Sequence, residues 1–218
     1  MSHHVLKLGE HDLQARADGS LFWPAMGLLC VSDLHLGKSE RIARRGGGLL
    51  PPYETQETLT RLDAAIAETA PRHVICLGDS FDDLDAATSL PETVRLHLAG
   101  LQAGRDWTWI EGNHDPGPVA LGGSHLAEHV LEGLRFRHIA TPDRPEVSGH
   151  YHPKARVPGT TAARPCFLAD RDRVLLPAFG AYTGGLRATE PVLRDRMGTD
   201  AIAILTGRRA VAVPLAAL

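Results

Sequence analysis

The sequence lacks the features that would place it in a membrane or outside the cell. Its 218 residues contain no uninterrupted apolar run near the roughly 18 residues that a membrane span needs. The first residues, Met1 to Lys7, lack the apolar core of a signal peptide. The three cysteines, an odd number spread widely, fit a reducing compartment better than a disulfide framework. We therefore expect a cytoplasmic protein with no membrane partner.

The sequence also lacks a strong excess of charge. The net charge of −3 by itself favours no polyanionic partner. Residues 1–127 carry 10 basic and 17 acidic side chains, a net −7, whereas residues 128–218 carry 13 and 9, a net +4. With 43% hydrophobic residues, no low-complexity tract and no internal repeat, residues 1–218 are expected to form one domain. A chain of this length can bury a core without disulfides or metal.

What is present is an alternation of predicted strands and helices. Apolar segments predict strands at 28–32, 73–77, 107–110, 134–138 and 146–148, preceded by short strands within 5–23 and followed by strands at 174–176, 201–205 and 210–213. Helical spacing of apolar residues occupies 55–70 and a segment that begins at Pro91. The pattern favours an α/β fold.

Side chains that bind metals follow these strands at the point where each strand ends. They are Asp33, His35, Asp79, Asn113, His138, His150 and His152. In α/β folds, ligands collect at this edge of the sheet. A mixed carboxylate, amide and imidazole set suits Mn²⁺, Fe²⁺ or Zn²⁺ and suits Ca²⁺ poorly. The set exceeds what one ion needs, so we predict two metals about 3.5–4 Å apart that share Asp79 and clamp a phosphoryl centre.

Four motifs carry these residues in a fixed order. They are Asp33-x-His35, Gly78-Asp79-x-x-Asp82, Gly112-Asn113-His114-Asp115 and Gly149-His150-x-His152. In order and type they resemble the calcineurin-like binuclear metallophosphoesterases. The resemblance implies a four-layer αββα sandwich of two mixed sheets. It also implies two metal sites, one held by Asp33, His35, Asp79 and His152, the other by Asp79, Asn113, His138 and His150.

One histidine of that set has competitors. The fourth motif of the family is a single histidine at a strand end, and His125 and His129 are alternatives to His138. We prefer His138 because it ends a predicted strand 12 residues before His150. His125 and His129 lie in a segment predicted as helix or loop.

Further motifs resemble a narrower group, the bacterial ligase-associated DNA damage response endonucleases of the PdeM type. They span nearly the whole chain and include Phe22-Trp23-Pro24, Leu50-Pro51-Pro52-Tyr53, Leu121-Gly122-Gly123 and Phe179-Gly180-Ala181-Tyr182. This resemblance implies a Mn²⁺-dependent endonuclease that cuts single-stranded DNA during repair. It also implies a DNA ligase, helicase or exonuclease as an expected associate.

The expected mechanism is in-line hydrolysis of a phosphodiester. A hydroxide that bridges the two metals attacks phosphorus, and His114, the catalytic acid implied by the resemblance, protonates the leaving oxygen. Asp82 either orients a ligand histidine or faces solvent. Asp115 either orients His114 or caps the following turn.

Contacts to substrate are expected in the segment after Gly37, which we predict as a loop. Its cations, Lys38, Arg41, Arg44 and Arg45, are candidates for phosphate contacts, and a solvated face is the alternative. Tyr151 is a candidate for stacking on a base, and packing in the core is the alternative.

Two other functions fit the same residues. One is hydrolysis of a small nucleotide, a lipid-linked pyrophosphate or a phosphoprotein. The other is a phosphoesterase-like binding module that has lost catalysis, which the presence of every ligand type disfavours. Metal content near zero in the purified protein would favour the binding module.

Overall fold

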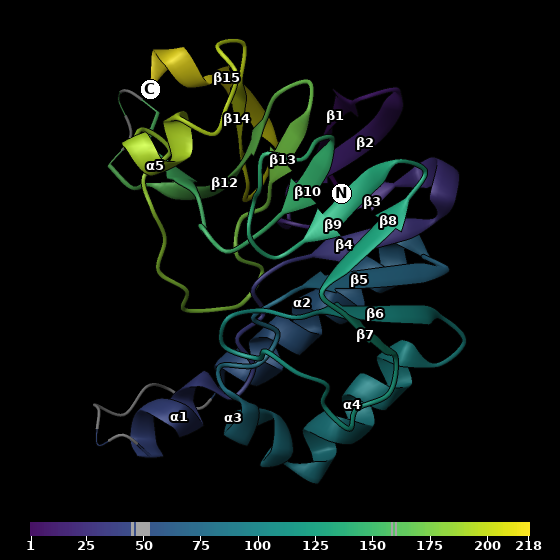
Figure 1. Ribbon diagram of the computed structural model, residues 1–218. Helices are drawn as coiled ribbons and strands as arrows, with labels where there is room; N and C mark the ends of the chain where they lie inside the picture. The colour runs from purple at the N-terminus through teal and green to yellow at the C-terminus, as the bar shows by residue number, and fades with distance from the viewer. Residues whose placement is uncertain (45, 47–52, 158, 160) are drawn as a thin grey trace.

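The computed structural model describes residues 1–44, 46, 53–157, 159 and 161–218, which form two β-sheets that pack face to face (Figure 1). In spatial order the first sheet contains β1 (His3–Leu8), β2 (His11–Arg16), β3 (Leu21–Trp23), β4 (Leu28–Val31), β5 (His73–Leu77), β6 (Asp106–Ile110) and β7 (Ser124–Leu126). The second contains β15 (Val211–Pro214), β14 (Ile202–Leu205), β12 (Arg164–Ala169), β13 (Arg173–Leu175), β10 (Glu146–Ser148), β9 (Leu134–Arg137) and β8 (Glu128–Leu131), and β11 (Lys154–Ala155) pairs with β12.

Both sheets are mixed. In the first sheet β1 to β4 are antiparallel neighbours, whereas β4, β5, β6 and β7 run parallel. In the second sheet β9, β10 and β13 run parallel and the other paired strands are antiparallel. Parallel strands present their carboxyl ends at one edge of a sheet, where ligands collect. This arrangement places the segments that follow β4, β5 and β6 next to one another.

Consecutive residues of the central strands point to opposite faces, and both faces are buried. In β4, Leu28 and Cys30 pack into the core between the sheets, whereas Leu29 and Val31 pack beneath the helices. Side chains alternate across a strand, so a strand covered on both sides is apolar throughout. This explains the unbroken apolar run that predicts β4 in the sequence.

Helices cover the outer faces of both sheets unequally (Figure 1). On the first sheet lie α2 (Glu54–Thr69) and α4 (Glu92–Gln102), with α1 (Lys38–Arg44) and α3 (Leu84–Thr88) beside them. On the second lie only α5 (Pro191–Arg194), the 3₁₀ helix η2 (Leu215–Ala217) and loops, as far as the described residues show. A further 3₁₀ helix, η1 (Pro24–Met26), precedes β4. The layers are those of the predicted αββα sandwich, with a thin fourth layer.

Most predicted elements are confirmed, and three predictions need correction. The segment after Gly37 begins as helix α1 rather than as a loop, and residues 45 and 47–52 of it lie outside the described residues. His125 lies in β7 and His129 in β8, so neither stands in a helix or loop. None of the helices in the described part of the chain has the length and apolar character that crossing a bilayer requires.

Candidate metal centre

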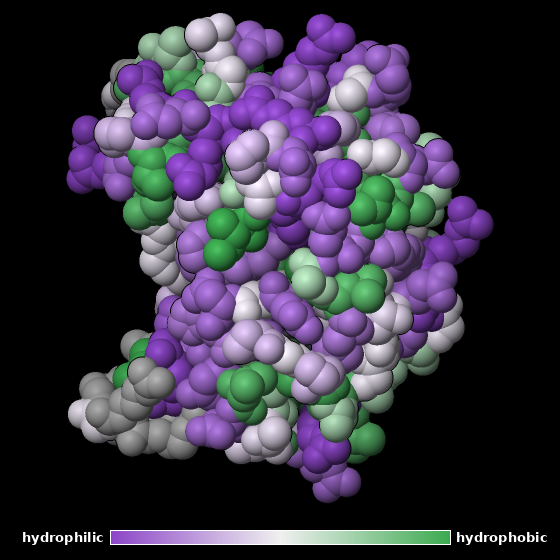
Figure 2. Space-filling view, viewed as in Figure 1, coloured by the Kyte–Doolittle hydropathy of each residue, from purple (hydrophilic) through white to green (hydrophobic). Residues whose placement is uncertain are grey.

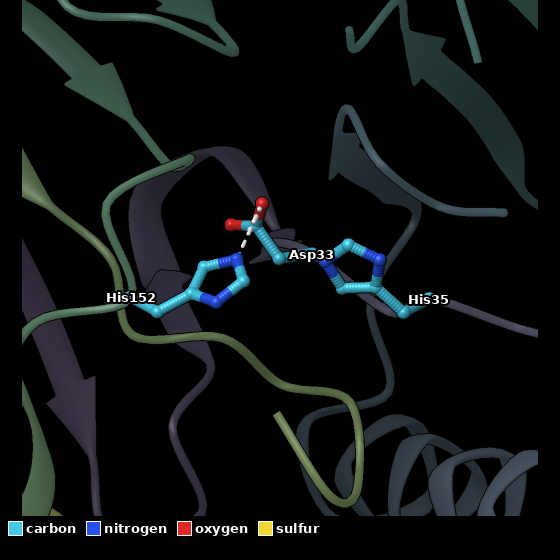
Figure 3. A group of neighbouring side chains, drawn as sticks. All are labelled: Asp33, His35 and His152. Carbon is cyan, nitrogen blue, oxygen red and sulfur yellow. Dashed lines mark ion pairs between the residues drawn. The ribbon is translucent and has the colours of Figure 1, made fainter. Parts of the chain in front are cut away.

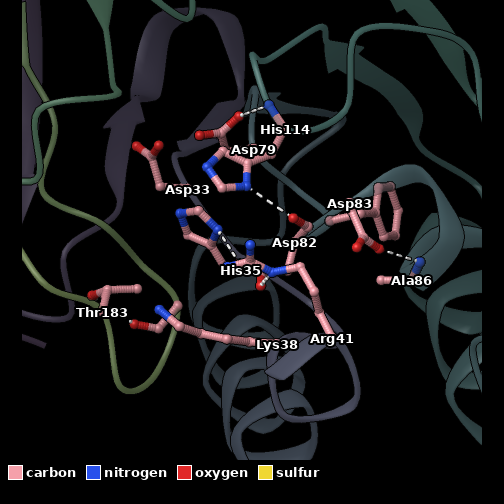
Figure 4. A network of polar contacts seen from close by, with 12 residues as sticks. Asp33, His35, Lys38, Arg41, Asp79, Asp82, Asp83, Ala86, His114 and Thr183 are labelled. Atoms are coloured by element: carbon pink, nitrogen blue, oxygen red, sulfur yellow. Dashed lines mark hydrogen bonds and ion pairs between the residues drawn. The ribbon is translucent and has the colours of Figure 1, made fainter. Parts of the chain in front are cut away.

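Three groups of acidic and imidazole side chains could hold a metal, and two of them combine residues from strand ends of both sheets; the third is His35, Asp82 and His114. Figure 3 draws one of these two groups, and Figure 4 draws Asp79 of the other together with the third group. The first group is Asp33, His35 and His152, and the second is Asp79, His138 and His150. Within each group the ligand atoms lie within 4.8 Å of one another. The segments after β4 and β5 in the first sheet, and after β9 and β10 in the second, supply them. The two sheets therefore contribute jointly to one cluster.

The first group holds buried ligand atoms that the protein itself does not satisfy. Asp33 Oδ1, His35 Nε2 and His152 Nε2 have no hydrogen-bond partner among the described residues. Asp33 Oδ1 and His152 Nε2 form a contact of 3.0 Å with each other that lacks hydrogen-bond geometry (Figure 3). A buried polar atom left without any partner, as His35 Nε2 is here, costs about 1–3 kcal/mol. A divalent cation among them would satisfy all three, so these residues fit a metal ion.

The second group converges on one ring nitrogen of His138. His138 Nδ1 lies 2.9 Å from the carbonyl oxygen of Leu77, to which it donates, so Nε2 is the atom turned to the group. Around Nε2 stand Asn113 Oδ1 at 3.0 Å, His150 Nδ1 at 3.2 Å and Asp79 Oδ2 at 3.3 Å. Imidazole nitrogens, a carboxylate oxygen and an amide oxygen that face one another in this way form a donor set that binds divalent transition metals.

The electrostatics of the cluster favour an added positive charge. Burial raises the pKa of Asp79, but the hydrogen bond and charge of His138 outweigh it and lower that pKa to about 2. Burial lowers the pKa of His138, yet the hydrogen bond to Asp79 and the charges of Asp33 and Asp79 raise it to about 9, so without metal the ring carries a proton that a bound cation would displace. Burial and the charge of His138 lower the pKa of His150, which keeps its ring neutral as a metal ligand must be.

Most of the clustered ligands have an unusual backbone conformation. Left-handed φ angles occur at Asp33 (54°), His35 (48°), Asp79 (44°), His150 (72°) and His152 (46°). Each such conformation of a residue other than glycine costs about 1–3 kcal/mol and persists only where the surroundings impose it. Here the imposing contacts include the bond from the N–H of His35 to the carbonyl of Asp79, 2.9 Å. The backbone is thus held against its preference at the metal centre.

Two glycines of the motifs are required by close approach. A Cβ at Gly112 would overlap the backbone nitrogen and side chain of Asp79. A Cβ at Gly149 would overlap the Ser32 side chain beside Asp33. These two glycines therefore let the backbone segments of the site approach one another closely.

Comparison with known families identifies the fold that carries this centre. The model of the calcineurin-like phosphoesterases matches residues 26–168, which include both groups of ligands. The chain belongs to the calcineurin-like phosphoesterase family.

Among solved structures, this phosphoesterase is similar to the nuclease MPE of Pseudomonas putida. The sequences are 28% identical, the TM-score is 0.76, and the match covers 97% of this chain and 100% of that one. No curated protein matches the chain. Family and structural relative together show a metal-dependent phosphodiesterase, a hydrolase that acts on ester bonds, related to nucleases.

The side chain of Asp82 orients a metal-ligand candidate of this phosphoesterase (Figure 4). Asp82 is buried, and its Oδ1 accepts a hydrogen bond of 2.8 Å from His35 Nδ1. Its Oδ2 accepts from Arg41 Nε. The bond to His35 fixes the tautomer that leaves Nε2 for the metal. Of the two predicted roles, orientation of a histidine is the one that the contacts support.

Asp82→Asn is therefore expected to weaken metal binding. The amide can accept from only one of the two neighbours that Asp82 now serves, so the His35 ring loses its fixed orientation. Losses of this kind lower metal affinity about 10- to 100-fold. Titration of metal-free protein with Mn²⁺, followed calorimetrically, measures the change. Asp85→Asn on α3 is the matched control, and equal affinities of the two variants would contradict the role.

Asp115 has a contact pattern that neither predicted role describes. Its two carboxylate oxygens accept hydrogen bonds from the backbone N–H groups of Asp79, Ser80, Phe81 and Gly112 at 2.8–3.2 Å. It therefore caps the loop that follows β5, not the turn that follows its own motif. It makes no hydrogen bond to the His114 ring among the contacts of the described residues. Through this cap, Asp115 holds the Asp79 backbone in place.

Most of the residues predicted to contact substrate are already occupied. Arg41 pairs with Asp82, and Tyr151 is only 6% exposed, with its ring under the Arg196 guanidinium and its hydroxyl accepting from Arg196 Nε. Tyr151 therefore packs, and the prediction that it stacks on a base is not supported. Lys38 lies near the centre and donates to the carbonyl of Tyr182, 3.3 Å. The side chain of Arg44 and all of Arg45 lie outside the described residues.

Proposed function

We propose that this phosphoesterase is an endonuclease that cleaves single-stranded DNA with two bound divalent ions. Mn²⁺ is the proposed metal, with Fe²⁺ and Zn²⁺ as alternatives, and DNA repair in the cytoplasm is the proposed setting. A DNA ligase, helicase or exonuclease is the proposed associate. The observation that supports the proposal most is the pair of ligand groups at the strand ends, in a chain similar over 97% of its length to a nuclease.

The two groups would each hold one ion. Asp33, His35 and His152 would hold the first; Asp79, Asn113, His138 and His150 would hold the second. Sharing of Asp79 by both ions stays a prediction, because Asp79 groups with His138 and His150 here. When bound, such a metal pair supplies Lewis acidity for the phosphoryl oxygens and a nucleophile from water at neutral pH.

His114 is the residue that we assign to proton transfer. Its backbone N–H donates to Asp79 Oδ1 at 2.9 Å, which ties it to the second group. Its ring Nδ1 donates to the carbonyl of Asp82 at 2.8 Å. Nε2 has no hydrogen-bond partner among the described residues and is the atom that would hold the proton for the leaving oxygen. The Asp82 peptide thus sets the ring of His114 while the Asp82 carboxylate sets that of His35.

The experiment that tests this function uses circular single-stranded DNA. A circle has no ends, so only an endonuclease can cut it. We expect linear fragments with Mn²⁺, none with EDTA, and much less cleavage of duplex DNA. Small diesters, nucleoside diphosphates and a phosphopeptide are assayed in parallel. Efficient hydrolysis of one of these with an intact circle would replace DNA as the substrate, and absence of bound metal would favour a binding module.

A further inference from the structure

A basic pocket that the predicted site does not include lies beside the metal centre. It has a volume of about 340 Å³. Its lining includes the cations Lys154, Arg156 and Arg187 together with Ala155, Ala188 and Thr189. No acidic side chain is among its lining residues in the described part of the chain. Leu218 also lines the pocket, and the three cations exceed the one carboxylate of that residue, so the concave surface is suited to an anion.

The backbone connects this pocket directly to the metal ligands. Lys154 follows the ligand His152 by two residues, which places it within about 7 Å along the chain. The segment around Arg187 runs beside it: the N–H of Lys154 donates to the carbonyl of Leu186 at 2.8 Å, and the N–H of Ala188 donates to the carbonyl of Lys154 at 2.8 Å. These bonds hold Arg187 next to Lys154. The pocket is therefore fixed relative to the centre.

The cations of the pocket keep N–H groups that are available to a ligand. Lys154 Nζ donates once, to the carbonyl of Thr183 at 2.9 Å, and that bond positions the ammonium group without neutralising it. The guanidinium groups of Arg156 and Arg187 are on exposed residues and have no ion pair among the described residues. The nearest carboxylate contact is to the backbone, where Glu190 Oε1 accepts from the N–H of Arg187 at 2.9 Å. Hydrophilic side chains gather on the flank beside α5 (Figure 2).

An exposed aromatic residue lines a neighbouring hollow that shares Lys154 with the pocket. Tyr182 is 54% exposed and has a left-handed φ of 55°. Lys38 donates to its carbonyl, and the next residue, Thr183, accepts from Lys154 (Figure 4). Lys38 belongs to the segment that also carries Asp33 and His35. Tyr182 therefore lies next to Lys154 of the pocket, and its main chain contacts the segment that follows the ligand His35.

We propose that Lys154, Arg156 and Arg187 form a subsite for the sugar–phosphate backbone of a single nucleic acid strand, with Tyr182 as the platform on which a base of that strand stacks. The subsite binds phosphates away from the one that is cleaved. The inference rests on the proposed nuclease function and gives it a substrate-binding path. Cationic grooves with interleaved aromatic rings are how proteins bind single strands without sequence preference.

Cleavage of oligonucleotides of increasing length at several salt concentrations tests this subsite. In the protein as it stands, kcat/KM is expected to rise with length until the strand reaches the pocket. The double variant Arg156→Ala, Arg187→Ala is expected to raise KM for long strands at least about fivefold. It should also lower the slope of log kcat/KM against log salt by about 1.4, because each phosphate contact on a single strand contributes about 0.7.

Two further variants make the test specific. Arg208→Ala, Arg209→Ala removes the same charge from the exposed turn between β14 and β15 and is expected to leave the salt slope unchanged. Tyr182→Ala is expected to raise KM about tenfold, and Tyr182→Phe, which keeps the ring, should restore it. For the subsite to be supported, each subsite variant must lower kcat/KM more on long strands than on the shortest substrate.

Each outcome separates the subsite from the nuclease function. If long strands are cut but the Arg156 and Arg187 double variant behaves like the Arg208 and Arg209 control, the subsite is wrong and the nuclease function stands. If no strand is cut in any protein, the nuclease function fails first. Inorganic phosphate that competes with short and long substrates equally would assign the pocket to a free anion and overturn the strand path.

Discussion

Asp79→Asn is expected to lower the rate of DNA cleavage by about 10³-fold or more. Asp79 Oδ2 lies 3.3 Å from His138 Nε2, and Oδ1 accepts from the N–H of His114 at 2.9 Å. The carboxylate thus contacts both a metal-ligand candidate and the residue assigned to proton transfer. Loss of its charge removes metal stabilisation worth several kcal/mol, and each factor of ten corresponds to about 1.4 kcal/mol.

Three measurements separate this effect from misfolding. Single-turnover cleavage gives the rate, elemental analysis gives the metal content, and circular dichroism shows whether the fold is kept. Asp85→Asn, an exposed carboxylate on α3, is the matched control and is expected to cleave normally. If the Asp79 variant retained full metal content and full activity, the assignment of the centre would be wrong.

His114→Ala is expected to have an effect that depends on the leaving group. General-acid catalysis contributes about 10²- to 10⁴-fold, and we expect a loss of that size on DNA, whose leaving alkoxide must be protonated. Hydrolysis of a p-nitrophenyl diester should be much less affected because p-nitrophenolate leaves without a proton. Steady-state kinetics on both substrates give the two losses.

The control for this variant is another histidine outside the centre. His97 lies on α4, and we expect His97→Ala to change the hydrolysis of neither DNA nor the p-nitrophenyl diester. Equal losses on DNA and on the p-nitrophenyl diester would remove His114 from the role of acid. A loss confined to metal content would instead make His114 a residue that positions Asp79.

The strand-end placement of the ligands was the part of the centre most open to prediction. Leu28–Val31 is apolar at every position because both of its faces are buried, and Asp33 and His35 follow directly. The same signal marks Asp79 after β5, whose residues Val74 to Leu77 are apolar. A run of this kind is a local property, so the sequence shows it. The αββα fold, the phosphoesterase family and the hydrolase class, which the resemblance of the four motifs implied, are all confirmed.

Features that depend on the packed structure could not be predicted. The left-handed backbone at the ligands is imposed by contacts such as that between His35 and Asp79, which are distant in the sequence. Tyr151 was a candidate for stacking because it stands between two ligands, and Tyr182 was not considered. Only the packing shows that the first ring is covered and the second is open.

The sequence did not predict β7 and β8, which carry His125 and His129, or helix α1, because each gives a weak local pattern. β7 and β8 contain three and four residues, too few for a period of two to stand out. Helix α1 was obscured by the glycines that follow it. Yet His138 was preferred to His125 and His129 on the strength of its strand, and the structure places His138, not the other two, in a ligand group.

Because the ligands come from both sheets, occupancy of the centre reports on the completeness of folding. Asp33 follows a strand of the first sheet and His150 a strand of the second, and the N–H of His150 donates to Asp33 Oδ2 at 3.0 Å. In a chain whose sheets had not yet docked, each metal site would have only part of its donors. Such incomplete sites bind metal ions weakly and discriminate little between metals. The complete set of donors exists only in the finished sandwich, so an immature chain would lack the metal-dependent hydrolase activity.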